Sequence, residues 1–363
     1  MKKYRVGVVG ARRGGNLINQ FIALPLVEIT AICDLLEERL TAVGKQYNVP
    51  DRFLFTEYDA FLDAPIGMVV IGTPIQIHAD QVIKALERGK HVLSEVTAAW
   101  TIEQCEQIVN TVKHTGKIYM VAENNCYYHF IREWKKWIRD GRLGKIFYAE
   151  SEYMHDIQDL IRDEKTGETF WRVERPPIYY CSHNLGPLLY LMEDQVIQAC
   201  GLHTGYNILP DLGPGCLSME VALFKTQKGA VIKILRSQVA YRWPPMEFYS
   251  LYGTKGYVEN GREGGWKRSE GKLFVIDEMS REEGHQVIDC SVSDPEAPQV
   301  ALRGGHNVSA EYFMIRDFIE AVNNNTKPPF DVIKAMDMTI PGICAHESAL
   351  NGGSWIDVPL FDW

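Results

Sequence analysis

A tyrosine and a histidine three residues apart have the types and spacing best suited to proton transfer in this chain. The segment reads Tyr180-Cys181-Ser182-His183. An imidazole has an unperturbed pKa of about 6.5, so His183 can accept a proton near neutral pH. Tyr180 shares its side of the chain if the segment begins a helix, although Pro187 limits where that helix runs without distortion. The pattern predicts a general base at His183 with Tyr180 beside it.

A second pair of this kind lies upstream. Tyr153 and His155 stand two residues apart in a segment that alternates apolar and polar residues, so both side chains point to one face of a predicted strand. A tyrosine with a pKa of about 10 ionises near neutral pH only beside a positive charge. The pair predicts a second proton acceptor, with Asp156 in position to orient His155. Ordinary packing is the alternative for all four residues.

A glycine-rich turn predicts a nucleotide site near the start of the chain. The strand-like residues 4–9 run into Gly10, Ala11, Arg12, Arg13, Gly14, Gly15 and Asn16, and an apolar helical segment follows. Glycine permits a tight turn, and the N–H groups at a helix N-terminus bind a pyrophosphate. Arg12 occupies the middle position of the usual Gly-x-Gly-x-x-Gly pattern. An ordinary strand-to-helix turn is the alternative.

One acidic residue favours NAD as the nucleotide. Asp34 follows the second predicted strand, 24 residues after Gly10. This is near the ~20-residue spacing at which a carboxylate accepts hydrogen bonds from ribose hydroxyls. A carboxylate there repels a 2′-phosphate. Arg12 and Arg13 argue the other way because guanidinium groups bind phosphate, so NADP is not excluded.

Further motifs in the first 125 residues give the chain a family resemblance. They are Gly72-Thr73-Pro74, His78, Ala85-Leu86 and the run from Gly89 to Glu95. Together with the glycine turn and Asp34, this series resembles the Gfo/Idh/MocA family of oxidoreductases. The resemblance implies a Rossmann domain and a C-terminal α/β domain whose open sheet forms dimers or tetramers. It also implies that Thr73, Pro74 and His78 lie along the cofactor and that Glu95 lies near the nicotinamide.

A departure from the family pattern narrows the resemblance to one branch. Most dehydrogenases of the family carry Glu-Lys-Pro where this chain has Glu95-Val96-Thr97, so the lysine that moves the hydroxyl proton is absent. The chain resembles the NAD-dependent glycosidases typified by bacterial α-N-acetylgalactosaminidases. The matching segments are 95–99, 123–127, 149–156, 180–187 and Gly304-Gly305-His306. This resemblance adds Val96 and Asn124 to the cofactor-binding residues.

The elements expected to position these residues fall into two groups. Apolar runs at 4–9, 27–33, 68–71, 91–93 and 118–121 alternate with amphipathic segments, which is typical of a doubly wound parallel sheet. Segments 146–153, 217–224, 230–237 and 247–252 alternate apolar with polar residues, as antiparallel strands with one covered face do. Helices are expected over 309–323 and 332–351. We therefore predict an α/β chain, with an NAD-binding Rossmann domain over 1–125. A substrate-binding and oligomerisation α/β domain with a large, mainly antiparallel open sheet is predicted over 126–363.

Composition limits the class of protein. The chain has 363 residues, 46% of them hydrophobic, and no run of the ~18 apolar residues that a membrane-spanning helix needs. Its net charge of −9 disfavours nucleic acid, and the basic run 132–145 is interpreted as a helix surface whose tryptophans are buried. The eight cysteines lack C-x-x-C spacing, which predicts no metal site and a reducing compartment. With no secretion signal visible, we expect a cytoplasmic protein.

The stretch 158–177 is polar and closed by two prolines, which predicts a surface excursion, conceivably a lid. Its Arg162, Arg172 and Arg175 are candidates for holding an anionic group on a substrate, because guanidinium binds oxyanions through two hydrogen bonds. A solvated loop is an equally good interpretation.

Three functions remain open at this point. The first is a sugar oxidoreductase that transfers a hydride between a ring carbinol of a sugar or glycoside and NAD. The second is a glycosidase without net redox change, which oxidises a sugar hydroxyl, eliminates the aglycone, adds water and returns the hydride, as the resemblance implies. The third is a sensor that binds sugar or cofactor without catalysis. The expected partners are a small sugar or glycoside and a second copy of the chain, in a homodimer or homotetramer.

Overall fold

The computed structural model describes residues 3–241, 247–263, 268–282, 284–302 and 308–362. The chain forms two compact units. The first comprises Met1–Tyr127, Asp294–Met336 and Phe361–Trp363, and the second comprises Tyr128–Ser293 and Asp337–Leu360. Residues 294–336 therefore pack with the N-terminal unit, although they follow the second unit's strands in the sequence. The functional division at residue 125 remains a proposal.

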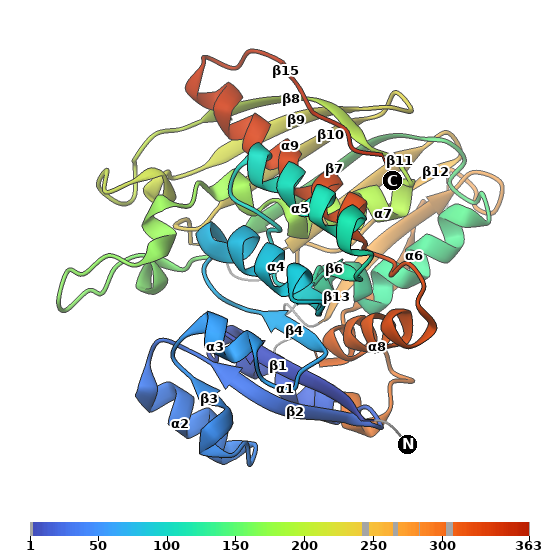
Figure 1. The fold of residues 1–363 in the computed structure, drawn as a ribbon. Helices are drawn as coiled ribbons and strands as arrows, with labels where there is room; N and C mark the ends of the chain where they lie inside the picture. Colours follow the sequence, from blue (N-terminus) through green and yellow to red (C-terminus); the bar gives the residue numbers. More distant parts are fainter. Residues whose placement is uncertain (1–2, 242–246, 264–267, 283, 303–307, 363) are drawn as a thin grey trace. The chain divides into compact units, whose positions relative to one another are not determined.

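The first unit is built on a six-stranded parallel sheet with the strand order β3-β2-β1-β4-β5-β6 (Figure 1). The strands are β1 (Tyr4–Val9), β2 (Val27–Cys33), β3 (Leu54–Phe55), β4 (Met68–Ile71), β5 (His91–Ser94) and β6 (Tyr119–Val121). All residues of β4 are buried, as its continuous apolar run predicts for a strand covered on both faces. The strand order reverses between β1 and β4, and ligands of such sheets bind outside the carboxyl ends of the strands at this switch point.

Helices cover both faces of this sheet because crossovers between parallel strands are right-handed. They are α1 (Arg13–Ile22), α2 (Glu37–Gln46), α3 (Tyr58–Leu62), α4 (His78–Glu87), α5 (Ile102–Thr115) and α8 (Val308–Asn324). The connection through α1 runs from β1 to β2 and that through α4 from β4 to β5, in opposite directions across the sheet, so the two helices lie on opposite faces. The late helix α8 packs against α1 and against the short 3₁₀ helix η3 (Asn124–Tyr127). This contact is the physical reason that residues 294–336 belong to the first unit.

The second unit contains a nine-stranded sheet with the order β14-β13-β12-β11-β7-β10-β9-β8-β15. Its strands are β7 (Ile146–Met154), β8 (Val196–His203), β9 (Glu220–Thr226), β10 (Val231–Ser237), β11 (Glu247–Gly253), β12 (Gly256–Glu259), β13 (Arg268–Val275), β14 (Gln286–Ser291) and β15 (Ile356–Asp357). All neighbours run antiparallel except β7 and β10, which are parallel. The predicted α/β class with a parallel and a mainly antiparallel sheet is confirmed.

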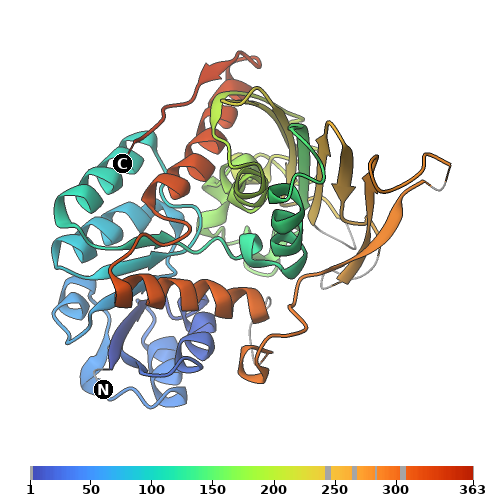
Figure 2. The ribbon, with the colours of Figure 1, turned by 90° about the vertical axis from the view of Figure 1, so that its right-hand side faces the viewer.

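One face of the nine-stranded sheet is covered by helices. Figure 2 shows α7 (Ser182–Met192) and α9 (Val332–Leu350) on that face. A Cβ on Gly201 of β8 would lie 2.0 Å from the carbonyl oxygen of Ala345 in α9, so only glycine fits this approach. α6 (His129–Arg139) packs against α7 and buries Trp134, while its cations Lys136 and Arg139 stay exposed.

The opposite face of this sheet carries apolar side chains that are open to solvent. Leu202 is 53% exposed, Leu223 is 40% exposed and Val231 is 37% exposed. The strand register places all three on the same face of β8, β9 and β10, away from α7 and α9.

The polar stretch 158–177 is only partly the surface excursion that was expected. It contains the 3₁₀ helices η4 (Gln158–Leu160) and η5 (Trp171–Glu174). Ile161 and Val173 are buried in a small cluster with Ile157, Cys216 and Val239, and Arg175 is buried as well. The expectation is therefore wrong for these positions, because three buried apolar residues from neighbouring segments give the stretch a core of its own.

Among the helices that the structure describes, none is long and apolar enough to cross a membrane. All eight cysteines carry free thiols, and seven of them are buried. Within the described ranges, no group of three or more His, Cys, Asp or Glu side chains could hold a metal ion.

Candidate active site

Three glycines bring backbone segments together at the switch point of the first unit. Gly10 has a φ of +81°, which favours glycine, and a Cβ there would lie 2.5 Å from the carbonyl oxygen of Gly72. A Cβ on Gly72 would in turn lie 2.5 Å from the nitrogen of Gly14. Gly14 packs against Val8, where a Cβ would lie 2.7 Å from a methyl carbon. The turn thus allows the close approach that a dinucleotide needs, and Gly14 provides the tight packing of helix on strand.

The other residues of the turn differ in exposure. Ala11 and Gly15 are buried, whereas Arg12 and Asn16 are exposed. Arg12 has a φ of −72°, a conformation open to any residue, so an arginine at the middle position causes no backbone strain. Ala11, Gly15 and Asn16 line a pocket together with Asn19, Val43, Gln46 and Tyr47.

Asp34 is held in place by main-chain donors. Its Oδ2 accepts the N–H of Ala11 at 2.8 Å and its Oδ1 accepts the N–H of Leu36 at 2.9 Å. Arg39 Nη1 lies 3.4 Å from both oxygens. A carboxylate has about four acceptor sites, of which the two main-chain donors take one on each oxygen; Arg39 at 3.4 Å binds only weakly, so a ribose hydroxyl can take one of the others. The observed contacts fit the predicted role and join Asp34 directly to the glycine turn.

Arg13 is paired with two acidic residues. Its Nε lies 2.7 Å from Glu95 Oε1 and its Nη1 lies 2.9 Å from Glu311 Oε1. Both carboxylates are buried. The Arg13 guanidinium is thus paired with two carboxylates. This pairing argues against Arg13 as a binding group for the 2′-phosphate of NADP, which the sequence interpretation had not excluded. Val96 is buried behind Glu95, and the peptide bond between Val96 and Thr97 is cis.

His78 connects two loops of the first unit. Its Nδ1 lies 2.9 Å from the carbonyl oxygen of Thr97, and its Nε2 lies 2.8 Å from that of Thr73. Burial lowers the pKa of His78, while the two carbonyl contacts act in the opposite direction. Its side chain is therefore placed to hold these loops rather than to present itself to a ligand. Pro74 is half-buried and follows Thr73, whose hydroxyl donates to Gln81 at 2.6 Å, and Asn124 is buried in η3.

In the second unit, His183 and Tyr180 lie together as predicted from their spacing. Their ring centroids are 4.9 Å apart in an edge-to-face arrangement. Tyr180 ends the 3₁₀ helix η6 (Pro177–Tyr180), and His183 is the second residue of α7. Pro187 lies inside α7 without ending it. The main-chain carbonyl of His183 accepts the hydroxyl of Tyr249 from β11 at 2.5 Å.

Tyr153 and His155 form the second part of this cluster. The Tyr153 hydroxyl and the His155 Nδ1 are 3.1 Å apart, and the Tyr153 ring lies 5.7 Å from that of His183. Burial, then the charge of Glu247, raises the pKa of Tyr153 above its usual value. Burial, then the charge of Arg236, lowers the pKa of His155 to about 4. At neutral pH the phenol is protonated and the imidazole is neutral, so the hydroxyl donates to Nδ1.

Two buried arginines lie next to these rings. The sequence interpretation missed Arg236, whereas Arg175 is one of the three arginines considered there for holding a substrate anion. Arg236 is 1% exposed, and its Cζ lies 4.2 Å from the centroid of the Tyr153 ring. It donates to the carbonyl oxygen of Pro177 at 3.1 Å and to Asn184 Oδ1 at 3.0 Å. Arg175 lies over the Tyr180 ring at 4.2 Å. The signal for Arg236 was the two-residue period of β10, which places it on the same face as the buried Ile232 and Ile234.

Glu247 is an acidic residue that the sequence interpretation missed. It lies in β11 opposite Tyr153 in the strand register, and it is buried. The Tyr128 hydroxyl donates to its two carboxylate oxygens at 3.2 and 3.3 Å. The cluster of the second unit therefore contains two phenols, two imidazoles, two guanidinium groups and one carboxylate, a set that can accept, hold and pass on protons.

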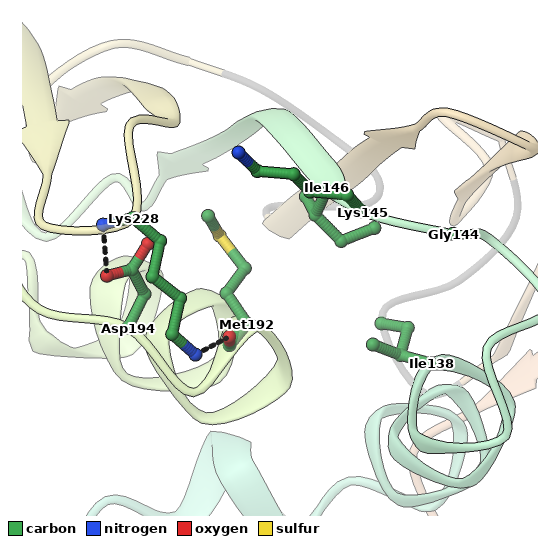
Figure 3. A pocket seen from close by; sticks show the side chains of 7 residues that line it. All are labelled: Ile138, Gly144, Lys145, Ile146, Met192, Asp194 and Lys228. Atoms are coloured by element: carbon green, nitrogen blue, oxygen red, sulfur yellow. Dashed lines mark hydrogen bonds between the residues drawn. The ribbon is translucent and has the colours of Figure 1, made fainter.

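A separate pocket of the second unit lies away from these residues. It is lined by Ile138, Gly144, Lys145, Ile146, Met192, Asp194 and Lys228 (Figure 3). The N–H of Lys228 donates to Asp194 Oδ1 at 3.1 Å, and its ammonium donates to the carbonyl oxygen of Met192 at 3.4 Å. Because Asp194 and the Lys228 ammonium are both bonded to main-chain groups, we assign no chemistry to this pocket. The segment with Gly304, Gly305 and His306 lies outside the described residues.

Comparisons with known proteins agree with the two sheets and the glycine turn. Residues 4–123 match the model of an oxidoreductase family with an NAD-binding Rossmann fold. The chain is 34% identical to a glycosyl hydrolase family 109 protein of Shewanella baltica, over 99% of this chain and 85% of that protein. Its fold is similar to that of an oxidoreductase domain protein from Kribbella flavida, with a TM-score of 0.83 and 17% identity over 99% of this chain and 100% of that one. It is also similar to levoglucosan dehydrogenase in complex with NADH and levoglucosan, with a TM-score of 0.83 and 20% identity over the same shares.

Proposed function

Because the chain belongs to glycosyl hydrolase family 109 and carries an NAD-binding Rossmann fold, we propose that it is a glycosidase that uses NAD without consuming it. The chain is an enzyme of the Gfo/Idh/MocA type, so the sensor considered from the sequence is set aside. The observation that carries the proposal is the presence of two separate proton acceptors in one cluster, His183 and the Tyr153–His155 pair. A dehydrogenase needs one base, whereas elimination after oxidation needs a second.

The residues of the first unit fit the cofactor. The Gly10–Gly72 approach leaves room for a pyrophosphate at the N-terminus of α1, and Asp34 retains an acceptor site for a ribose hydroxyl. When bound, NAD accepts a hydride from a ring carbinol of the sugar and later returns it. Val96 and Thr97 stand where most family dehydrogenases have Lys-Pro, so the proton of that carbinol needs an acceptor elsewhere.

His183 is proposed as that acceptor. A neutral imidazole removes the hydroxyl proton as the sugar carbon becomes a carbonyl, and Tyr180 at 4.9 Å packs against its ring. The carbonyl then acidifies the C–H on the neighbouring carbon. The Tyr153–His155 pair is proposed to remove this proton: Tyr153 takes the proton of the C–H as its own passes to His155 Nδ1 along the 3.1 Å hydrogen bond. The Arg236 guanidinium over the Tyr153 ring favours the phenolate during this transfer.

Turnover of a nitrophenyl glycoside in heavy water tests the proposal. We expect nitrophenol release in amounts that exceed the bound cofactor many times, no net NADH by chromatography, and deuterium at C2 of the sugar. His183→Ala should lower kcat by about 10²–10⁴. Accumulation of one NADH per substrate consumed would instead make the protein a dehydrogenase, the second candidate. Retention of the C2 proton would refute the elimination step.

Two further properties belong to the proposal. The exposed face with Leu202, Leu223 and Val231 supports a homodimer or homotetramer in which this face packs against a second copy, since apolar patches of this kind mark interaction surfaces. The eight free thiols support a reducing compartment, for which we propose the cytoplasm. A small glycoside remains the proposed substrate, without nucleic acid or membrane as a partner.

A further inference from the structure

Arg175 lies inside the second unit without an acidic partner among the described residues. Its side chain is 4% exposed. Nη2 donates to Gln238 Oε1 at 2.7 Å, and Nε is buried with no hydrogen-bond acceptor in the described part of the chain. The largest electrostatic effects on Arg175 come from Tyr180, Arg172, Arg236 and Tyr153, none of which is a carboxylate, and Arg175 also interacts with His155.

Such a cation is costly to bury. Removing an ionised group from water lowers stability unless a counter-charge and hydrogen bonds offset the lost hydration. Burial lowers the pKa of Arg175 to about 9, which still leaves the guanidinium charged at neutral pH. Its contacts with the rings of Tyr180 at 4.2 Å and Trp171 at 5.5 Å replace only part of the lost hydration. The site therefore holds a positive charge with an unused donor.

This charge lies next to the proposed catalytic residues. Arg175 packs on the ring of Tyr180, and the same ring lies 4.9 Å from that of His183. Arg172 lies nearby, with its Cζ 4.4 Å from the Trp171 ring. The carboxylate of Glu247 faces Tyr153 and accepts the Tyr128 hydroxyl. The positive charge is thus concentrated beside Tyr180.

We propose that the substrate carries an anionic group, a carboxylate or a sulfate ester on the sugar, and that Arg175 binds this group beside Tyr180 and His183. This inference rests on the proposed function, because it names the substrate class of the same site. An oxyanion supplies the missing counter-charge, and its two oxygens match the planar guanidinium. A neutral sugar provides neither.

The test compares the activity of the wild-type protein on matched nitrophenyl glycosides. Neutral galactosides, glucosides and N-acetylgalactosaminides are paired with the corresponding uronides and 6-sulfates. We expect kcat/KM for at least one anionic substrate to exceed that of its neutral partner at least about tenfold. Arg175→Gln should lower kcat/KM for the anionic substrate by about 10–100-fold, mainly through KM, and so reduce the ratio of anionic to neutral kcat/KM at least about tenfold. Comparison of the uronides with the sulfates shows whether the anionic group that the protein prefers is a carboxylate or a sulfate ester.

Control variants and binding measurements complete the test. Arg162→Gln removes an exposed guanidinium of the same stretch and should leave the preference unchanged. Arg175→Lys, which keeps the charge, should retain part of the preference. If Arg175→Gln does not fold, thermal shifts of the wild-type protein decide: free uronic acids should stabilise it more than neutral sugars at equal concentration. A folding defect in a variant is identified by comparing its cofactor content and its unfolding midpoint with those of the wild-type protein.

The outcomes separate this inference from the proposed function. Neutral glycosides cleaved as fast as their anionic partners, or stabilising the protein as strongly, would overturn the inference and leave the glycosidase intact. An equal loss on both substrates in Arg175→Gln would also overturn it, since Arg175 would then act on atoms common to both. Net NADH formation with a preserved preference for anionic substrates would refute the glycosidase and support the anion site.

Discussion

The hydroxyl of Tyr249 takes the place of a main-chain donor that Pro187 lacks. A helix normally pairs each carbonyl with the N–H four residues later, and Pro187 has no N–H to offer to His183. Tyr249 lies on β11, and its hydroxyl donates to that carbonyl at 2.5 Å. The donor therefore comes from a strand outside the helix. The proline therefore ties the proposed base to the sheet.

Tyr249→Phe should reduce both stability and activity. The variant leaves the buried carbonyl of His183 without a donor, at a cost of ~1–3 kcal/mol in the free energy of unfolding. We expect kcat to fall more than KM rises, because the position of His183 changes while the other contacts remain. Chemical unfolding and steady-state kinetics measure the two effects.

Pro187→Ala provides the control for this variant. It restores an N–H for the His183 carbonyl, so the pair Tyr249→Phe and Pro187→Ala should be less destabilised than the sum of the single variants. Strict additivity in the double-mutant cycle would show that the proline and the hydroxyl are unrelated.

Removing the Tyr153 hydroxyl should stop proton exchange at the sugar. Tyr153→Phe keeps the ring under Arg236 but leaves nothing to pass a proton to His155. We expect kcat to fall by about 10²–10⁴ and deuterium uptake at C2 to fall with it. Tyr148→Phe is the matched control, because Tyr148 lies on the same strand but on the opposite face. Unchanged deuterium uptake in Tyr153→Phe would contradict the proposed role.

The lowered pKa of His155 predicts a specific acid sensitivity. The unfolded chain binds a proton at this site below a pKa of about 6.5, whereas the folded protein does so only below about 4. Stability is therefore fully present above pH 6.5 and falls as the pH drops from about 6.5 to 4. Wild-type protein should lose ~1–3 kcal/mol more over this window than His155→Gln.

Two features make this measurement specific. His91, whose pKa is also lowered to about 4, is present in both proteins and cancels in the difference. His203→Gln, a change at an exposed histidine, should follow the wild-type curve. A His155→Gln protein that loses as much stability as the wild type would argue against the lowered pKa.

Asp34→Asn should weaken NAD binding. The amide keeps the shape of the carboxylate but loses the charge that attracts the N–H groups of Ala11 and Leu36 and a ribose hydroxyl. We expect the dissociation constant for NAD to rise about tenfold or more and the preference over NADP to shrink. Equilibrium titration of the cofactor-free protein measures both nucleotides. Asp59→Asn changes an exposed carboxylate and should have no effect.

A charge on the open face of the nine-stranded sheet should disrupt the proposed oligomer. Leu223→Lys places an ammonium among Leu202 and Val231, which would be buried in the contact. We expect a smaller particle by light scattering, with an unfolding midpoint that becomes independent of protein concentration. Exposed Leu350→Lys on α9 serves as the control. A wild-type protein that is monomeric at all concentrations would rule out the contact.

The elements of the first unit could be predicted because its strands are mostly apolar runs. The ranges 4–9, 27–33 and 68–71 coincide with β1, β2 and β4, since burial on both faces favours apolar residues. The polar residues Arg5, Glu28 and Thr30 stand at positions of β1 and β2 that are not fully buried, whereas β4 is apolar and buried throughout. The Tyr153–His155 and Tyr180–His183 pairs were accessible because each is local in sequence. The residues that surround those pairs in the structure could not be predicted in this way.

What escaped prediction depends on contacts between distant segments. Arg236 and Glu247 lie on β10 and β11, and only the strand register brings them to Tyr153. Arg175 reads as a solvated arginine in a polar stretch, and its burial follows from the packing of Trp171 and Tyr180 around it. No local pattern indicates that residues 294–336 pack with the first unit.

That packing has a consequence for the order in which the chain matures on the ribosome. The N-terminal 127 residues emerge first, but Glu311, one of the two acids that neutralise Arg13, follows almost two hundred residues later. During that interval the nascent sheet carries an uncovered α1 and an incompletely balanced guanidinium. The nucleotide turn thus reaches its final electrostatic state only after the strands of the second unit have been translated.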